Sequence, residues 1–468
     1  MSYVPTIGLE VHAELKTLSK MFCGCKNDPH EGEPNAHTCP VCLAHPGSLP
    51  VPNEEAIKKV LMFGTAIGAT LATFTEFDRK NYFYPDIPKA YQISQYAYPF
   101  VTGGILSGVE ITRVHLEEDT ARSLHDKGDF SLVDFNRAGV PLMELVTEPV
   151  IHDAETAGAF ARELQLLLRT LDISDANMER GEMRVEANIS VSKNPDKMAT
   201  KYVEVKNLNS FKSVEGAIAF EIKRQIEVLE KGGEVVQETR GWDEVNLRTF
   251  TQRVKETAKD YRYFPDPDLT KMDISKTLLP EITVKLPNEK RELYRNLGLT
   301  SAQIEQIISD IKLDFFLWKL VEEHKIDDVD LVKLAANYLL SDVLALLSAD
   351  PLKSLDLLKP DYFFELISML RNNDINSRVG KDLLLQLFGS EKSPLEIATE
   401  KNLLQISDAA ALQSVITEII AVNPEIAAEY KAGKETAIQF FVGQGMKATH
   451  GSANPTLLLE GFKEALKS

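Results

Sequence analysis

The sequence predicts an α+β fold, with a mixed N-terminal region followed by helices. Residues 6–17 alternate apolar and polar side chains, and residues 184–191 repeat this period of two, which is typical of strands with one buried face. Asn53 and Asp153 are residue types that cap helices, and each precedes a run with apolar residues at helical spacing. The first part of the chain is therefore expected to form a sheet accompanied by a few helices.

The C-terminal part predicts helices only. The segment 279–288 contains prolines and is predicted to be a linker. From residue 292 to 468 the chain is rich in Leu, Ile, Ala, Lys and Glu with helical periodicity, and Thr300 with Gln303 predicts a capping box. A glycine-rich stretch, 443–455, is expected to interrupt the final helices.

The length and net charge of the chain limit its domain number and the classes of protein to which it can belong. A chain of 468 residues is too long for one hydrophobic core, so we expect about two to four domains. Lys and Arg number 52 against 70 Asp and Glu, and the net charge of −18 disfavours a general nucleic-acid binder without excluding a local basic site for one structured RNA. No apolar run approaches the roughly 20 residues of a membrane-spanning helix, so we expect no membrane association.

All the cysteines lie close together, as Cys23, Cys25, Cys39 and Cys42. Two close pairs joined by a short loop can place four thiolates around one tetrahedral Zn²⁺, so we predict a structural zinc in the loop 20–45. The alternatives are two disulfides or buried apolar thiols. Disulfides require an oxidising compartment, and no charged-then-apolar leader opens the chain, so we expect a cytoplasmic protein, with an organelle matrix as the alternative reducing compartment. Such a zinc leaves no thiol for catalysis.

A second group of candidate ligands lies on the first predicted strand. Glu10, His12 and Glu14 project from one face, because alternate residues of a strand share a face. A solvent-facing strand would show the same pattern, but more acidic residues follow within 115–119 and 136–144. An acidic pocket of this kind could hold a hard divalent cation such as Mg²⁺, and a histidine ligand would suit Mn²⁺ or Zn²⁺ as well.

Other segments do not indicate one chemistry. Residues 77–91 interleave cations with aromatic side chains, as base-stacking surfaces do, although an ordinary loop with buried tyrosines has the same composition. The segments 206–210 and 237–243 are polar, and their residues alone assign them no role. The chain lacks a glycine-rich phosphate loop, since Gly433 is not preceded by the required glycine spacing, and it lacks a Gly-x-Ser-x-Gly nucleophile motif.

Several longer motifs run in order along nearly the whole chain. They are TIGLEVHAELK (6–16), RKNYFYP (79–85), PKAYQISQ (88–95), HLEED (115–119), VDFNRAGVPL (133–142), VKNLNSF (205–211), QETR (237–240) and DYRYFPDP (260–267). Together these motifs resemble the GatB family, the B component of the heterotrimeric aspartyl/glutamyl-tRNA(Asn/Gln) amidotransferases.

The resemblance implies an enzyme that forms carbon–nitrogen bonds on tRNA. The family converts Glu on tRNA(Gln), or Asp on tRNA(Asn), to the amide, after ATP phosphorylates the side-chain carboxylate. Ammonia comes from a glutaminase in the A subunit, and a small C subunit holds the other two together. A zinc-bound set of cysteines agrees with this division, because the chain then has no thiol to hydrolyse glutamine. Which of the two misacylated tRNAs is the substrate stays open.

The resemblance also implies site residues. The active-site metal ligands of the family fall on His12, Glu118 and Glu144, with Glu10 close by. Strand alternation places Glu117, rather than Glu118, on the face of His115, so either the strand ends there or a bulge redirects it. Further catalytic or ATP-contacting candidates are Lys80, Tyr84, Lys89 and Arg137.

By the same resemblance, residues 1–290 form a mixed α/β, cradle-like catalytic domain with the zinc loop 20–45. Residues 291–398 form a helical domain, and residues 399–468 form a helical tail that contacts tRNA. Two alternative functions remain. The chain could be a non-catalytic tRNA-binding scaffold, which would tolerate changes at Glu118 or Glu144. Alternatively, Cys39 or Cys42 could be a glutaminase nucleophile, which stoichiometric zinc would exclude.

Overall fold

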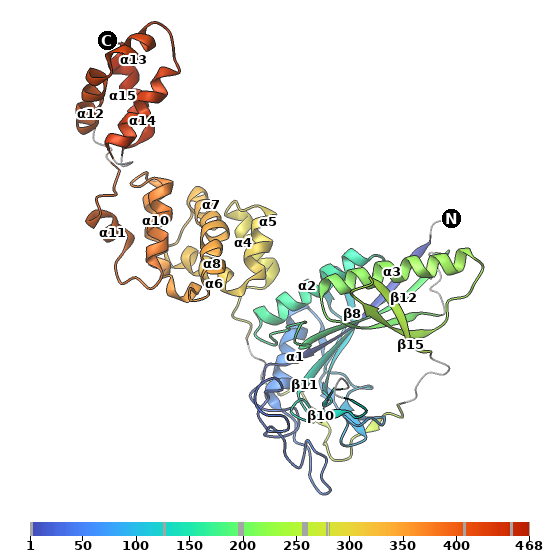
Figure 1. Cartoon of the computed structure of the whole chain (residues 1–468). Coiled ribbons are helices and arrows are strands. Elements are labelled where there is room, and N and C mark those ends of the chain that lie inside the picture. Colours follow the sequence, from blue (N-terminus) through green and yellow to red (C-terminus); the bar gives the residue numbers. More distant parts are fainter. Residues whose placement is uncertain are drawn as a thin grey trace. The chain divides into compact units, whose positions relative to one another are not determined.

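The structure is a computed structural model that describes residues 3–124, 128–194, 201–254, 261–277, 279, 281–405, 409–449 and 453–467. The chain divides into two compact units, Met1–Pro287 and Asn288–Ser468. The first unit mixes strands and helices and the second is helical (Figure 1), which confirms the predicted α+β class.

A ten-stranded sheet forms the centre of the first unit. Its strand order is β15-β14-β13-β12-β1-β11-β8-β6-β2, with β7 paired to β8, and the pairs are antiparallel except for β13–β14. The strands are β1 (Val4–Glu14), β2 (Thr70–Leu71), β6 (Val101–Thr102), β7 (Ile105–Leu106), β8 (Val109–Glu118), β11 (Pro141–Thr147), β12 (Met183–Ser192), β13 (Val203–Leu208), β14 (Glu238–Asp243) and β15 (Arg248–Val254).

The central strand β1 shows why the sheet has one apolar and one polar face. Ile7, Leu9 and Val11 are buried in the hydrophobic core, whereas Glu10 and His12 alternate with them and face the opposite side. β12 repeats this alternation beside β1. Both strands predicted from the period of two are confirmed.

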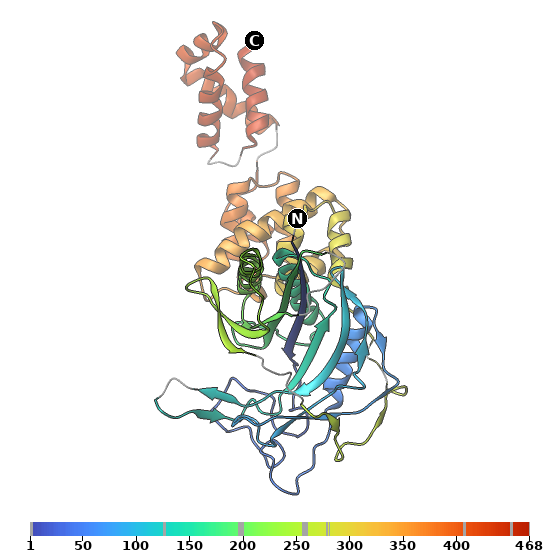
Figure 2. The same cartoon turned by 90° about the vertical axis from the view of Figure 1, so that its right-hand side faces the viewer.

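Three helices cover the apolar face (Figure 2). They are α1 (Glu54–Ala66), α2 (Ala154–Thr170) and α3 (Phe211–Glu230). Asn53 accepts hydrogen bonds from two backbone N–H groups at the start of α1, and Asp153 accepts one from Thr156 at the start of α2, as expected for N-caps. The two predicted helix starts are thus confirmed.

Three smaller sheets accompany the large one among the described residues. The three-stranded sheet β16 (Phe264–Pro265), β4 (Asp78–Asn81) and β5 (Tyr91–Ser94) places β5 against β8. Two further pairs are β9 (Arg122–Leu124) with β10 (Leu132–Asp134), and β3 (Phe74–Thr75) with β17 (Met272–Asp273). Lys80 of β4 and Gln92 of β5 line a cavity on the polar side of the large sheet, whereas Ile93 of β5 belongs to the hydrophobic core.

A buried polar network joins α3 to the outer strands β14 and β15. Arg240 Nη1 donates a hydrogen bond to Glu238 Oε1 at 2.7 Å, and Arg240 Nε donates to Thr249 Oγ1 at 2.8 Å. Thr249 Oγ1 in turn donates to Glu221 Oε2 at 3.0 Å, and Glu221 is fully buried in α3. The polar segment around Arg240, which the sequence left without a role, thus fastens a helix to two strands.

Replacing Arg240 by Ala should destabilise the first unit by about 3 kcal/mol. This is the lower end of the range for breaking a buried ion pair, because Arg224 still contacts Glu221. Denaturant unfolding would be followed by the fluorescence of Trp242, which packs on α3, in a Trp318→Phe background. The control, Arg162→Ala, breaks an exposed ion pair and should cost less than about 1 kcal/mol. Equal effects would contradict the structural role of the network.

The second unit contains helices only among its described residues. They are α4 (Pro287–Asn296), α5 (Ser301–Ser309), α6 (Ile311–Glu323), α7 (Val329–Tyr338), η1 (Leu339–Val343), α8 (Leu344–Ala349), η2 (Leu355–Leu357), α9 (Pro360–Arg371), α10 (Ser377–Leu387), α11 (Pro394–Glu400), α12 (Ala409–Val422), α13 (Pro424–Lys431), α14 (Ala437–Ala448) and α15 (Pro455–Lys467). The capping box of Thr300 and Gln303 is confirmed. Helices α12–α15 surround their own hydrophobic cluster, and a domain boundary at residues 398/399 stays a prediction.

Two details of this unit differ from the sequence expectations. Gly443 and Gly445 lie inside α14, and at Gly445 a Cβ atom would approach Leu458 to 3.0 Å, so this glycine permits close helix packing. Residues 450–452 of the glycine-rich stretch lie outside the described residues. One segment, Val329–Ala349, is long and apolar enough to cross a membrane, a property that buried helices of globular proteins share.

Candidate functional site

A row of three side chains crosses the polar face of the large sheet. β1, β11 and β8 are neighbours, and their register pairs His12 with Glu144 and Glu144 with His115. Directly opposed residues of an antiparallel pair share a face, so all three side chains point to the same side. His12 Nε2 lies 3.3 Å from Glu144 Oε2, and His115 Nε2 lies 3.4 Å from the same oxygen.

Two more carboxylates flank this row. His12 Nε2 lies 3.8 Å from Glu10 Oε1 and 3.6 Å from Glu117 Oε1. The ligand atoms of Glu10, His12 and Glu144 lie within 4.8 Å of one another, as do those of His115, Glu117 and Glu144. Glu144 belongs to both groups. The chain therefore brings together oxygen and imidazole donors at the spacing that one divalent cation needs.

Burial and mutual charge shift the pKa values in this cluster. Burial, together with the negative charge of Glu144, raises the pKa of Glu10 to about 7. Burial lowers the pKa of His12, but the hydrogen bond and the charge of Glu144 outweigh it, and the resulting pKa is about 9. Burial also raises the pKa of Glu144, whereas His115 and His12 lower it to well below its usual value. The cluster thus holds a positive imidazolium between carboxylates, at the position that a bound cation would compete for.

Glu10, His12 and Glu117 of this cluster line a cavity of about 310 Å³, together with four cationic side chains. These are Lys80 of β4, Arg137 of the β10–β11 connection, Arg184 of β12 and Lys206 of β13. Lys80 Nζ lies 3.9 Å from Glu117 Oε2. A cavity with a carboxylate–histidine floor and several cations fits an anionic ligand that carries a divalent ion.

Arg137 and Arg184 hold the end of β8 from two sides. Arg137 donates hydrogen bonds to the backbone oxygens of Thr120, at 2.9 Å, and Ala121, at 3.1 Å. Arg184 Nη2 donates to Asp119 Oδ2 at 3.0 Å. Both guanidinium groups are therefore fixed by buried or partly buried partners while they line the cavity.

The structure does not bring Glu118 to His12 and Glu144. The pairing of β8 with β11 continues without a shift from His115 to Glu118, so Glu118 points to the opposite side from Glu117. Its carboxylate accepts hydrogen bonds from Lys89 Nζ at 2.7 Å and from the backbone N–H of Ile93 at 3.0 Å. Glu118 and Lys89 line a separate cavity of about 230 Å³ beside the cysteine loop.

The remaining predicted residue, Tyr84, lies farther from the cluster. Its side chain is exposed, and its ring centroid is 6.1 Å from that of Tyr82, which lines the main cavity.

Sequence reasoning assigned no site role to several cavity residues. Lys206 forms an ion pair with Glu186 and lies 3.2 Å from Glu204 Oε1. The signal for Arg184 and Glu186 was present, since both belong to the polar face of a predicted strand. What was missing was the pairing of β12 with β1, which places that face beside Glu10 and His12.

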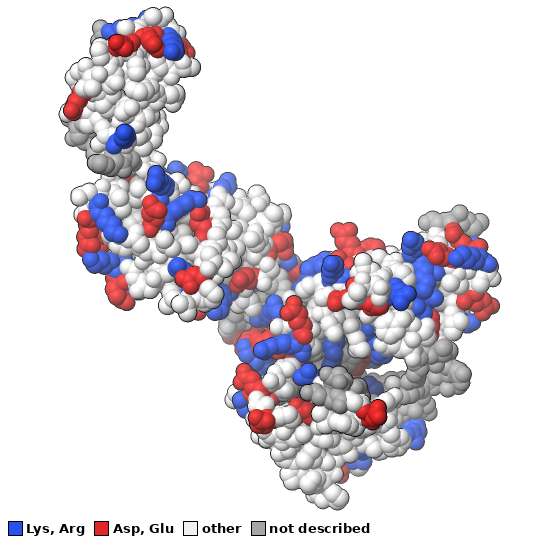
Figure 3. Space-filling model, in the orientation of Figure 1, with Lys and Arg blue, Asp and Glu red and all other residues white. Residues whose placement is uncertain are grey.

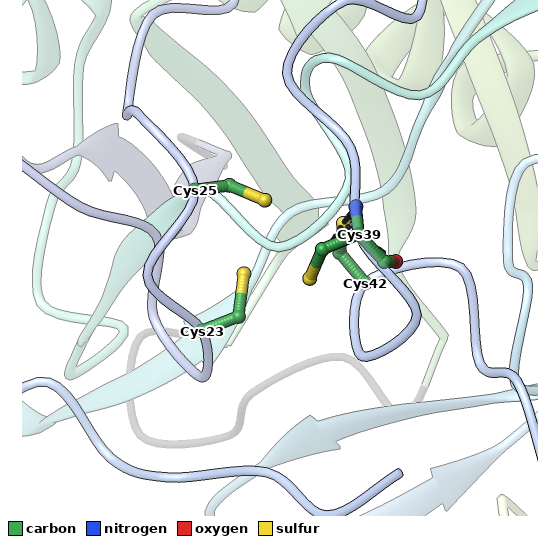
Figure 4. Close-up of side chains that lie close together, drawn as sticks. All are labelled: Cys23, Cys25, Cys39 and Cys42. Atoms are coloured by element: carbon green, nitrogen blue, oxygen red, sulfur yellow. Dashed lines mark hydrogen bonds between the residues drawn. The ribbon is translucent and has the colours of Figure 1, made fainter.

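The four cysteines converge on one point (Figure 4). Their Sγ atoms all lie within 4.8 Å of one another, although Cys23 and Cys25 come from a different part of the loop than Cys39 and Cys42. The hydrogen bond from the Cys23 thiol lowers the pKa of Cys42 to about 5, which favours its thiolate. None of the cysteines forms a disulfide, so this donor set fits a tetrahedral Zn²⁺.

Comparison with known proteins identifies the family. The sequence-family model of the GatB/GatE catalytic domain matches residues 5–280, and the family model of the GatB domain matches residues 319–466. The chain is 42% identical to the B subunit of the aspartyl/glutamyl-tRNA(Asn/Gln) amidotransferase of Persephonella marina, over the full length of both proteins. It is also 42% identical to the corresponding proteins of Brevibacillus brevis, of which the match covers 99%, and Moorella thermoacetica, of which it covers all. The chain therefore belongs to the GatB family, the B subunits of the tRNA-dependent aspartyl/glutamyl-tRNA(Asn/Gln) amidotransferases.

Proposed function

We propose that this chain is the component that activates and amidates misacylated tRNA. Its substrates are Glu-tRNA(Gln), Asp-tRNA(Asn) or both, together with ATP. It works in a heterotrimer with a glutaminase A subunit that releases ammonia and a small C subunit. Residues 1–290 form the catalytic domain and residues 399–468 bind the tRNA. Its free cysteines fit a reducing, cytoplasmic location.

The reaction has two balanced steps. First, an oxygen of the side-chain carboxylate attacks the γ-phosphorus of ATP, the bond to the β-phosphate oxygen breaks, and ADP leaves. Second, ammonia attacks the carbonyl carbon of this acyl phosphate, the carbon–oxygen bond to phosphate breaks, and inorganic phosphate leaves with the loss of one proton from nitrogen. ATP is needed because a free carboxylate lacks a good leaving group.

The main observation behind this proposal is the cavity in which Glu10, His12 and Glu117 lie beside cationic side chains, with Glu144 in contact with His12. Lys80 and Arg137 would bind phosphate oxygens, which are anionic at neutral pH. A fixed set of cations stabilises the charge of a transferring phosphoryl group without reorganising at the moment of reaction.

A divalent ion, Mg²⁺ or Mn²⁺, would be held by Glu144 and His12 together with Glu117 or Glu10. We propose Glu117 in place of Glu118, because only Glu117 lies beside His12. Held there, such an ion would supply positive charge that offsets the negative charge of the ATP phosphates during transfer. The Zn²⁺ proposed at the four cysteines would be structural, since four thiolates leave no open coordination position.

The two neighbouring glutamates should differ sharply as variants. Glu117→Gln should lower transamidation by about 100-fold and weaken Mn²⁺ binding, because it removes a charged donor from the cluster. Glu118→Gln should cost less than about 10-fold, because it weakens only the contacts with Lys89 and Ile93. Steady-state rates and Mn²⁺ titration by electron paramagnetic resonance would measure both. A larger loss of transamidation and of Mn²⁺ binding in Glu118→Gln than in Glu117→Gln would identify Glu118 as the metal ligand.

For the tRNA tail we propose recognition of shape rather than of charge. Residues 424–468 contain five Lys and five Glu. On the face drawn in Figure 3, most of this tail carries neither acidic nor basic side chains, and no broad basic patch covers its described residues. Backbone and small side chains can read the shape of a folded RNA without such a patch.

The test of this function is a transamidation assay with the assembled A, B and C subunits. Glu-tRNA(Gln) carrying labelled glutamate would be incubated with ATP, Mg²⁺ and ammonium chloride, and the amino acid released from the tRNA would be identified. Labelled glutamine, formed only with ATP, supports the proposal. Tight tRNA binding without any product would favour the alternative of a non-catalytic scaffold.

A further inference from the structure

The cysteine loop, residues 20–45, packs against the segment that carries Arg137. This segment, residues 133–139, includes the last residues of β10 and most of its connection to β11, and is called the arginine segment below. Met21 N–H donates to the backbone oxygen of Gly139 at 2.7 Å. A Cβ atom at Gly139 would lie 3.6 Å from Cys42 Cβ, and the φ of Gly139 is +85°. The cysteine cluster and the arginine segment are therefore in direct contact.

Beside the hydrogen bonds that Asn35 of the loop makes with the arginine segment, Asn136 forms a buried link between the two. Its side chain is 2% exposed. Asn136 Oδ1 accepts a hydrogen bond from the backbone N–H of His37 at 2.8 Å, and Asn136 Nδ2 donates one to the backbone oxygen of Glu33 at 3.0 Å. Because both partners are backbone groups, these hydrogen bonds depend on the backbone conformation of the cysteine loop rather than on its side chains.

Lys20 adds a further buried link. It is 1% exposed, and its Nζ donates to the backbone oxygens of His37 at 2.7 Å and Phe135 at 3.2 Å. A buried ammonium with two fixed carbonyl partners holds one residue of the loop and one of the arginine segment at a set distance. His37 of the loop is thus held by hydrogen bonds with both Lys20 and Asn136.

Arg137, the residue that follows Asn136, reaches into the main cavity together with His12. Its side chain is 24% exposed and lines the cavity, while its guanidinium group donates hydrogen bonds to the backbone oxygens of Thr120 and Ala121. A shift of the backbone at Asn136 would move this group, because the two residues are adjacent.

We propose that the cysteine loop with its metal sets the position of Arg137 through Asn136. This inference rests on the proposed function, in which Arg137 binds an anionic group of ATP or of the acylated tRNA end. The metal centre, although remote from the reacting atoms, then influences substrate affinity. Asn136 is a positioning residue in this account.

The test is a double-mutant cycle in the assembled enzyme, with KM for ATP and for Glu-tRNA(Gln) measured separately from kcat. Asn136→Ala should raise one of these KM values by about 10-fold, as loss of an outer hydrogen-bond partner does at other sites. The variant that combines Asn136→Ala with Arg137→Ala should resemble Arg137→Ala alone within about 2-fold, because both act on the same group. If the fold-change in KM of the double variant equals the product of the fold-changes of the two single variants, the inference is wrong.

Further variants distinguish a change in the position of Arg137 from a general loss of folding. Asn136→Asp keeps the acceptor for His37 N–H and should have an intermediate effect, so the test survives if Asn136→Ala folds poorly. The control, Ser48→Ala, removes hydrogen bonds to Pro40 and His45 beside the cysteines without touching the arginine segment. It should leave both KM values unchanged, and a KM rise equal to that of Asn136→Ala would overturn the specific role of Asn136.

Zinc content gives a readout that does not depend on activity. Asn136→Ala should retain the zinc of the wild-type chain, and a KM rise that appears only when zinc is lost would overturn the role of Asn136. If Arg137→Ala itself leaves both KM values unchanged, the assigned role of Arg137 fails and this inference fails with it. If Arg137→Ala has a large effect on KM and Asn136→Ala adds its own effect to it in the double variant, this inference is wrong, but the proposed role of Arg137 stands.

Discussion

His12→Ala should abolish transamidation while glutamine hydrolysis by the A subunit continues. His12 is the side chain that contacts Glu10, Glu117 and Glu144 at once, at 3.3–3.8 Å. Its removal takes away a proposed metal ligand and leaves three carboxylates without their shared partner. Since loss of an outer-shell partner alone typically costs about 10–100-fold, we expect a loss of more than about 100-fold in kcat/KM.

The measurement is the formation of labelled Gln-tRNA by the assembled enzyme, alongside glutamine hydrolysis in the same sample. His152→Ala is the matched control, because His152 is exposed and its ring pairs with the backbone oxygen of Pro5, outside the cavity. Its rate should equal that of the wild-type enzyme. Transamidation by His12→Ala at the wild-type rate would show that the cluster on β1 and β11 is not the reaction site.

Cys42→Ser should remove the metal and loosen the loop 20–45. A structural zinc site holds about one ion in four thiolates, and the free energy of metal binding is also folding free energy for the residues around it. Zinc content should therefore fall from about one ion per chain to near zero, and proteolysis within the loop should become faster. Inductively coupled plasma mass spectrometry and limited proteolysis would measure these changes.

Chelation of the wild-type chain should reproduce the proteolysis pattern of Cys42→Ser. Ser48→Ala, just beyond the same loop, should keep its zinc. If Cys42→Ser instead retained zinc while glutamine hydrolysis stopped, the alternative of a cysteine nucleophile on this chain would be correct.

Local patterns predicted the strands, helix starts and capping box, because these depend on residues near one another in the chain. The alternation on β1 and the N-caps Asn53 and Asp153 are examples. Gly445 shows the limit of such reasoning. Glycines usually weaken helices, but here the glycine lies inside α14, where it allows contact with Leu458. That contact depends on a partner helix that the local sequence does not specify.

The site required long-range pairing. Alternation alone favoured Glu117 over Glu118, and the unbroken register of β8 with β11 places Glu117 on the face of His115. The resemblance to the family pointed instead to Glu118. Lys206 could not be foreseen, because it reaches the cavity through the pairing of β13 with β12. Sheet order therefore determines which polar residues meet.

The most direct test of the central claim uses Glu144→Gln, because Glu144 belongs to both groups of possible metal ligands and its side chain is almost fully buried. Gln keeps the size of Glu but removes its charge. The assembled enzyme would receive labelled Glu-tRNA(Gln), ATP, Mg²⁺ and ammonium chloride in a single turnover, with tRNA binding measured in parallel. Our account predicts normal tRNA binding and no labelled glutamine. Glutamine formed at the wild-type rate would contradict the assignment of activation and amide transfer to this cavity.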